Sequence, residues 1–159
     1  MRLFEFMGVV HKIAVDFYED SFTLIAIHSS LEDYALVYAL NLYLETNFRR
    51  SGEDIELFDR VSFPIFEWKD IKKERSWALI TNQGVKEETQ LRADLFEDQP
   101  SFAKYYVIPE YKDADYLLRI QHDEELEEDI LKSLLKIPKV VTAYGIEVEN
   151  LKSKTNVIF

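Results

Sequence analysis

The pattern of hydrophobic and polar positions predicts mostly β-strands, paired across polar turns. Residues 11–17 alternate apolar and polar side chains, and residues 22–28 form an apolar run rich in Leu and Ile. A polar segment separates the two runs, so we expect them to form a first hairpin. Residues 62–69 and 76–82 predict a second hairpin. Pro64 cannot donate to a sheet ladder, which places it at an edge or in a bulge.

Further strand segments follow from the same pattern. They are residues 55–58, residues 104–108 and 114–121 as a third hairpin around a turn at 109–113, and residues 140–148. Residues 84–103 differ, because they are polar and acidic and show no clear period. This stretch predicts a long surface loop or one short helical turn.

Two segments predict helices. Ser29 and Glu32 fit a capping box, in which the serine hydroxyl accepts from a free backbone N–H and the glutamate reaches back, so a helix should run over residues 30–47. A second helix should cover residues 124–136, with Asp123 as its cap and Pro138 as its stop. Its predicted buried stripe consists of Leu126, Ile130, Leu134 and Leu135.

These elements predict an α+β fold, with a mainly antiparallel sheet built from hairpins and two helices packed on one face. The chain has 159 residues, which suits one domain. Residues 1–10 are too short an apolar stretch to span a membrane, and Glu5 interrupts them. We therefore expect residues 1–10 to be an N-terminal extension and residues 11–159 to form a single domain.

Charge and composition narrow the classes of function. With 30 acidic and 19 basic side chains, the net charge of −11 disfavours direct binding to nucleic acid or to anionic membranes and favours a basic protein partner. The absence of cysteine excludes disulfides, thiolate metal sites and cysteine nucleophiles, and fits a reducing compartment. No glycine-rich phosphate loop or common hydrolase motif occurs. We expect a soluble cytoplasmic protein without a cofactor.

Acidic residues and a histidine provide the only candidate chemistry. His28 and Glu32 lie where a predicted strand meets a predicted helix, and three carboxylates follow one another closely near position 110. Carboxylates and imidazole could hold a divalent metal or transfer protons. Ordinary structural roles explain the same residues, since Glu32 suits a cap and Asp113 a turn. The alternative enzyme site would comprise His28, Glu32, Glu110, Asp113 and Asp115.

The first predicted helix is apolar on nearly every side. Among residues 34–44 only Asn41 is polar, whereas a helix that covers one face of a sheet needs an apolar stripe on one side only. Either another part of the chain covers the second side, or that side is an interface with a second copy or another protein. Tyr34, Tyr38 and Tyr43 favour an interface, because tyrosine buries a large area and keeps a polar end.

The last residues are basic and then apolar, on an otherwise acidic chain. Residues 152–159 favour an edge strand that closes the sheet. The alternative is a docking tail whose Phe159 enters a partner.

The nine residues Ile108-Pro-Glu-Tyr-Lys-Asp-Ala-Asp-Tyr116 resemble the motif of the IPExxxVDY family, an uncharacterised bacterial family. The matching positions are Ile108, Pro109, Glu110, Asp115 and Tyr116, and the chain departs from the motif at Ala114, where the family has valine. The similarity extends from about residue 11 to residue 159. The resemblance implies a cytoplasmic bacterial protein and assigns no catalytic residue.

Three functions remain open from the sequence. The first is a non-enzymatic interaction or adaptor protein, monomeric or homodimeric, that binds a basic protein through the apolar helix or an exposed strand edge. The second is a small metal-dependent enzyme that uses the carboxylate and histidine site. The third is a component of an RNA-processing or ribosomal assembly, held there by protein contacts.

Overall fold

Strands dominate the computed structural model, which describes residues 22–89, 100–121 and 127–159. The α-helices are α2 (Asp33–Tyr43) and α3 (Glu127–Leu135), and the 3-10 helices are η1 (Pro109–Tyr111), η2 (Val148–Asn150) and η3 (Lys154–Val157). The strands are β1 (Phe22–Ser29), β2 (Arg49–Arg50), β3 (Ile55–Leu57), β4 (Val61–Phe63), β5 (Ile65–Asp70), β6 (Arg75–Thr81), β7 (Gln83–Thr89), β8 (Pro100–Tyr106), β9 (Tyr116–Gln121) and β10 (Val140–Ile146). Residues 1–10, expected to be an extension, lie outside this range.

The main sheet has six strands in the order β10-β1-β9-β6-β5-β2, and every adjacent pair is antiparallel. β1 is a central strand with β9 on one side and β10 on the other. The predicted first hairpin paired β1 with residues 11–17, which lie outside the described residues. The predicted second hairpin is confirmed as β5 and β6, which pair from Ile65 opposite Ile80 to Asp70 opposite Arg75.

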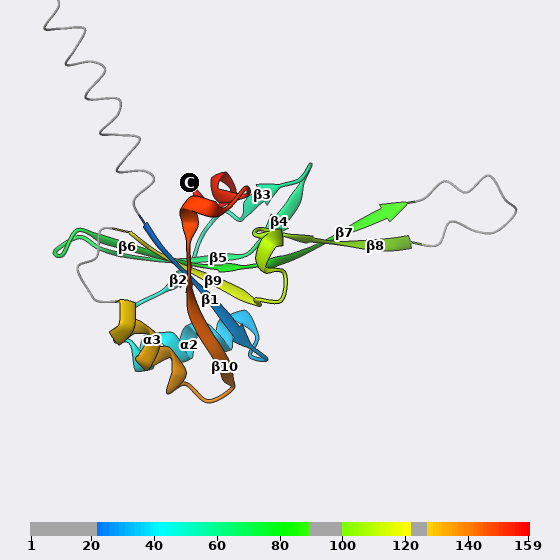
Figure 1. Ribbon diagram of the computed structural model, residues 1–159. Helices are drawn as coiled ribbons and strands as arrows, with labels where there is room; N and C mark the ends of the chain where they lie inside the picture. Colours follow the sequence, from blue (N-terminus) through cyan, green and yellow to red (C-terminus); the bar gives the residue numbers. More distant parts are fainter. Residues whose placement is uncertain (1–21, 90–99, 122–126) are drawn as a thin grey trace, which may run out of the picture.

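Both helices lie on one face of the sheet, as the sequence predicts (Figure 1). Leu36 and Leu40 of α2 and Ile130 and Leu134 of α3 are buried in one core cluster. The sheet residues of this cluster include Ile25, Ile27, Trp77, Leu79, Leu118 and Ile120. Side chains of a strand point alternately to the two faces, so every second residue of β1 reaches the helix layer.

The opposite face of the sheet is also covered. Leu24 and Ala26 of β1 lie in a second core cluster with β3–β4 residues, the segment after β8, and Val157 near the end of the chain. Figure 1 shows these segments on the side of the sheet away from the helices. A strand buried on both faces is apolar at nearly every position, which explains the continuous apolar run that begins at Phe22.

Pro64 lies between two strands, so the single strand predicted over residues 62–69 is divided at this residue. It separates β4, which pairs with β3 in a small sheet, from β5, which belongs to the main sheet. Its carbonyl oxygen accepts a hydrogen bond from the backbone N–H of Thr81 at 3.1 Å. A residue that lacks a backbone N–H therefore marks the point where the chain changes sheets.

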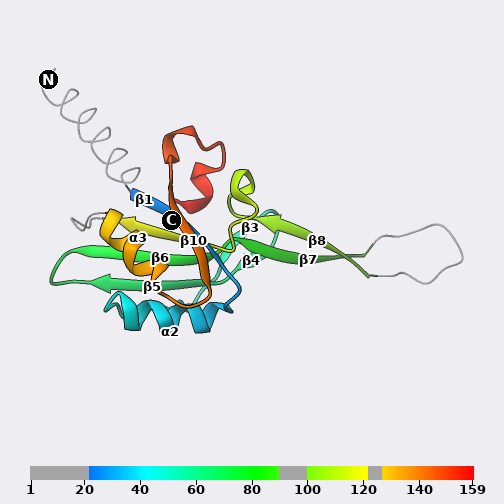
Figure 2. The same ribbon diagram turned by 60° about the horizontal axis from the view of Figure 1, so that its bottom comes forward.

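The expected loop at residues 84–103 is wrong where the chain is described. β7 and β8 form a long hairpin that projects from the rest of the molecule (Figures 1 and 2). Val85 and Phe102 are 54% and 66% exposed, so no buried face imposes an alternating pattern on this hairpin. Gly84 anchors it, since a Cβ there would lie 2.7 Å from Val61 Cγ1. Because β8 pairs with β7 and β9 pairs with β1 and β6, the predicted third hairpin is also wrong.

The predicted capping box of the first helix is wrong as well. Ser29 is the last residue of β1, and its hydroxyl donates to the Lys139 carbonyl at 2.8 Å and accepts from the Leu31 N–H at 3.1 Å. α2 begins three residues later than predicted, after Glu32, whose side chain makes no capping hydrogen bond. A long-range partner for the Ser29 hydroxyl thus replaces the local cap.

The second helix and the end of the chain differ in detail from expectation. Ile130 and Leu134 are buried as predicted, but Leu135 is 52% exposed, and Asp123 and Leu126 lie outside the described residues. The preferred edge strand at residues 152–159 is wrong, because η3 forms there and packs on the sheet face through Val157.

Candidate functional site

The motif turn, residues 108–116, is held by a buried asparagine from another part of the chain. Asn82 is fully buried between β6 and β7. Its Nδ2 donates to the carbonyl oxygens of Tyr111 (3.0 Å) and Ala114 (2.9 Å), and its Oδ1 accepts from the backbone N–H of Ile108 (2.9 Å). One side chain therefore fixes both ends of the turn, and Pro109 suits its place at the start of η1.

The last two motif residues bind the junction between β1 and α2. Asp115 Oδ2 accepts from the backbone N–H of Ser29 at 2.9 Å, and the Tyr116 hydroxyl donates to the Leu31 carbonyl at 2.5 Å. Burial, together with the negative charges of Asp33, Asp115 and Glu32, raises the pKa of Tyr116 to about 12. The phenol thus stays protonated and able to donate at neutral pH.

Glu110 binds the C-terminal segment. Its carboxylate accepts from the backbone N–H groups of Lys152 (3.1 Å) and Ser153 (3.3 Å) and from the Ser153 hydroxyl (2.9 Å). Slight burial alone would raise the pKa of Glu110, but these hydrogen bonds outweigh it and hold the pKa below the ordinary value. The Glu110 carboxylate of the turn is thus occupied by donors of its own chain.

The alternative enzyme site is not gathered into a metal centre. In residues 22–89, 100–121 and 127–159, no group of three or more His, Asp or Glu side chains could hold a metal ion. Asp115 and Glu110 are engaged with backbone N–H groups, and Glu32 precedes α2. His28 Nε2 lies 2.9 Å from the Tyr144 hydroxyl. Burial, with the nearby Tyr111 and Asp113, raises the pKa of Tyr144.

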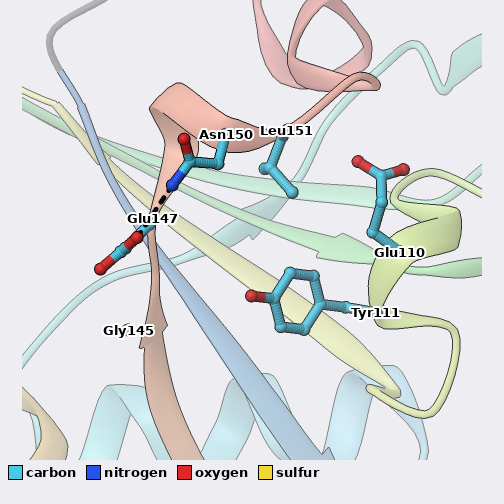
Figure 3. A pocket seen from close by; sticks show the side chains of 6 residues that line it. All are labelled: Glu110, Tyr111, Gly145, Glu147, Asn150 and Leu151. Atoms are coloured by element: carbon cyan, nitrogen blue, oxygen red, sulfur yellow. Dashed lines mark hydrogen bonds between the residues drawn. The ribbon is translucent and has the colours of Figure 1, made fainter.

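A shallow pocket of about 460 Å³ lies between the motif turn and the C-terminal segment (Figure 3). In Figure 3, Glu110 and Tyr111 extend from the turn, and Asn150 and Leu151 lie across from them. Glu147, on the same rim, accepts from Asn150 Nδ2 at 3.0 Å. The lining residues are Glu110, Tyr111, Gly145, Glu147, Asn150 and Leu151. This set includes no nucleophile paired with a base, so the pocket marks a seam between two packed segments.

The tail residue Phe159 is held by its own chain, although it is 50% exposed. The Arg119 guanidinium lies 3.8 Å from the centre of the Phe159 ring and donates to the Val157 carbonyl at 2.8 Å. Arg119 is only 5% exposed, and this burial lowers its pKa below the ordinary value. The negative charge of nearby Glu67 opposes the effect but does not outweigh it. The structure thus gives Phe159 a role in closing the sheet face, and its use by a partner stays a prediction.

The first helix presents large side chains to solvent, as the sequence indicates. Tyr34, Tyr38 and Leu42 are 66%, 73% and 65% exposed and follow one another at intervals of four residues, so they share one side of α2. We call these three residues the outer stripe of α2. Tyr43 is 40% exposed, and Leu40 is buried on the other side.

The outer stripe lies between acidic residues. Glu32 and Asp33 precede it at the start of α2, Glu45 follows the helix, and the last turn contains no basic residue. The Tyr34 hydroxyl donates a hydrogen bond to the Glu32 carboxylate, and this bond together with the negative charge of Glu32 raises the pKa of Tyr34. The surface therefore combines exposed aromatic and aliphatic area with negative charge at both ends.

Several residues that organise these sites escaped prediction. Asn82 was predicted only as the last residue of a strand, and Leu42 was not distinguished from the other apolar residues of its helix. The one usable signal was Arg119, because a charge inside an otherwise apolar strand needs a buried partner. Sequence alone did not indicate that the partner would be the tail.

Comparisons with known proteins identify no relative of this chain. No family model matches the chain, and neither does any curated protein or solved structure. Within the described residues, no helix is long and apolar enough to cross a membrane. Function is therefore inferred from the residues themselves.

Proposed function

We propose that this chain is a non-enzymatic cytoplasmic adaptor that binds a basic protein through the outer stripe of α2. The observation that carries the proposal is that three large side chains, each about two-thirds exposed, line one side of a helix whose other side is buried. Tyrosine is enriched at interfaces and among the residues that contribute most binding energy. A groove on the partner would bury the stripe.

The charges beside the stripe favour a different protein over a second copy at this surface. If two α2 helices packed against each other in antiparallel fashion, Glu32 and Asp33 of one copy would approach Glu45 of the other. Like charges placed together weaken an interface, whereas a basic rim on the partner would complement them. The net charge of −11 likewise disfavours a second copy and favours a basic partner.

The two other functions have less support. Two of the four carboxylates of the alternative enzyme site, Glu110 and Asp115, accept hydrogen bonds from backbone groups, which leaves them poorly placed for metal binding or proton transfer. A protein-bound role in an RNA-containing assembly is a special case of the adaptor, in which the basic partner also binds RNA. If the resemblance to the IPExxxVDY family holds, the contacts of Glu110, Asp115 and Tyr116 suggest that the motif preserves the fold.

The test is capture of partners from the native cytosol by the immobilised full chain, with nuclease added to remove RNA tethers. The stripe variant Tyr38→Ser/Leu42→Gln keeps similar helix propensities and removes most of the apolar area. We expect it to weaken binding of a basic partner at least tenfold. The matched control is Ile71→Gln, since Ile71 is 90% exposed in the β5–β6 turn, far along the chain from α2.

The identity and charge dependence of the retained protein decide the result. A basic protein that both the wild type and the Ile71→Gln control retain, and the stripe variant loses, supports the adaptor. Neutralisation by Glu32→Gln/Glu45→Gln should slow association with that partner and reduce its salt dependence. Equal retention by the stripe variant, or loss of every partner after nuclease treatment, contradicts the proposal.

A further inference from the structure

The two sides of α2 differ in the arrangement of large and small side chains. Along a helix, residues four apart form rows, and neighbouring rows lie side by side on the helix surface. On the side that packs on the main sheet, Leu36 and Leu40 form one row and Val37 lies in the next, and all three are buried. Two neighbouring rows of large side chains fill the space above a sheet at the density that protein interiors require.

The solvent side of α2 has one large row and one small row. The outer stripe is the large row, and Ala35 and Ala39, both partly exposed, form the row beside it. Figure 2 shows α2 along the boundary of the described part of the molecule, with no described element beyond it. A flat surface laid on this side would touch the stripe and leave empty space above the alanines, which loses packing contacts. The outer side of α2 therefore suits a ridged surface better than a flat one.

A second helix has such a ridged surface. Two helices pack when the rows of large side chains on one enter the grooves between the rows of the other, with the axes about 8–10 Å apart. The outer stripe provides the projecting row on α2. The small side chains of Ala35 and Ala39 leave room for a row of leucine-sized side chains from the other helix. The two helices would then interlock over about two turns of α2.

The charges around α2 define the chemistry of that helix. Glu32 and Glu45 are exposed at opposite ends of α2, Asp33 lies beside Glu32, and α2 itself contains no basic residue. These acidic ends repel the phosphates of nucleic acid and of anionic lipid surfaces. Lysine and arginine beside the apolar row of a partner helix would instead lie close to them.

We propose that the outer stripe of α2 binds a basic amphipathic helix of the partner protein, whose large apolar row lies over Ala35 and Ala39. The inference rests on the proposed adaptor function and names the element of the partner that this surface binds. An extended strand fits less well, because the backbone groups within α2 are hydrogen-bonded along the helix and provide no edge for pairing.

Two synthetic peptides of the same composition, each of about 20 residues, test the shape of the occupant. One has leucine at intervals of three and four residues with lysine on either side, which gives a helix an apolar stripe. The other alternates leucine and lysine, which is the pattern of a strand. Fluorescence anisotropy measures binding of each labelled peptide to the full chain at about 1 μM to 1 mM. We expect the helical peptide to bind about tenfold more tightly and to gain helical circular dichroism on binding.

The variant Ala35→Leu distinguishes interlocking rows from general apolar attraction. Ala35 is the suitable position, because Ala39 packs against the core. Alanine and leucine both favour helix, so α2 should keep its structure, which thermal unfolding checks. The larger side chain would occupy the space of the partner row and weaken binding of the helical peptide about tenfold, although it adds apolar area. Ala35→Ser keeps a small side chain and is the matched control, which should bind like the wild type.

The outcomes separate this inference from the adaptor function. Equal binding of the two peptides, no binding of the helical peptide, or undiminished binding by Ala35→Leu would overturn the helical partner. Undiminished binding of the helical peptide by Tyr38→Ser/Leu42→Gln would overturn it too, because the peptide would then bind elsewhere. In the capture from cytosol, a basic protein that Ala35→Leu retains and the stripe variant loses would leave the adaptor in place without a helical partner. Retention of that protein by the stripe variant would contradict the adaptor itself.

Discussion

The motif turn and the outer stripe of α2 both contained candidate functional residues, and they differ in how the rest of the chain uses them. In the turn, Glu110, Asp115 and Tyr116 each bind a group of another segment. In α2, Tyr38 and Leu42 extend mainly into solvent. The polar residues of the turn thus hold segments of the chain together, whereas the apolar side chains of the stripe remain in solvent.

The physical reason lies in the cost of leaving each kind of group without a partner. A buried polar group without a hydrogen bond destabilises the fold by about 1–3 kcal/mol, so turns inside a protein acquire partners. An exposed apolar side chain costs the folded state little, because it is exposed in the unfolded chain as well. The comparison therefore predicts large losses of stability for the turn and almost none for the stripe.

The largest effect is expected for Asn82→Ala. The substitution leaves the Ile108 N–H and the carbonyls of Tyr111 and Ala114 buried without their partner, and it should lower the free energy of unfolding by about 3–5 kcal/mol. Urea denaturation measures this change. Asn150→Ala, which removes one exposed hydrogen bond to Glu147, is the matched control and should cost under about 0.5 kcal/mol. A loss below about 1 kcal/mol for Asn82→Ala would show that the turn is held by other contacts.

The distinction between buried and solvent-exposed side chains also explains which parts of the fold could be predicted from the sequence. Burial imposes a period on the sequence, so β5, β6 and the common face of the two helices were predicted correctly. The β7–β8 hairpin projects into solvent and is held by backbone pairing, which leaves no period to detect. The start of α2 was misplaced because the Ser29 hydroxyl binds Lys139, which is 110 residues away in the chain.

The candidate sites also differ in how much of each could be predicted from the sequence. The excess of apolar residues in the first helix predicted an uncovered side, although Leu42 could not be distinguished from the core by composition. The role of Asn82 could not be predicted, since its partners are 26 to 32 residues away and are positioned by the fold. Local patterns reveal surplus apolar surface, but they do not reveal long-range hydrogen bonds.

A smaller effect is expected for Glu110→Gln, at about 1 kcal/mol, because the carboxylate is exposed and its hydrogen bonds compete with water. The lowered pKa sets the pH dependence. The stabilisation by the carboxylate is fully present above its unfolded pKa, near the ordinary value of 4.5, and is lost as the pH falls through the lower folded value. The difference in unfolding free energy between wild type and variant should therefore shrink between neutral pH and acid. A difference that stays constant with pH would mean that the Glu110 carboxylate does not stabilise the contact between the turn and the C-terminal segment.

The smallest effect is expected for Tyr38→Ser/Leu42→Gln, which replaces two of the three residues of the outer stripe. Tyrosine and serine have similar helix propensities, as do leucine and glutamine, so stability should stay within about 0.5 kcal/mol of the wild type. The contrasting variant in the same helix is Leu40→Ala, which should cost about 2–5 kcal/mol because Leu40 is fully buried. Thermal and urea unfolding of both variants measure the difference between the two sides of α2. A loss above about 1.5 kcal/mol for the stripe variant would mean that another part of the chain packs on the stripe, and would contradict its proposed use as a binding surface.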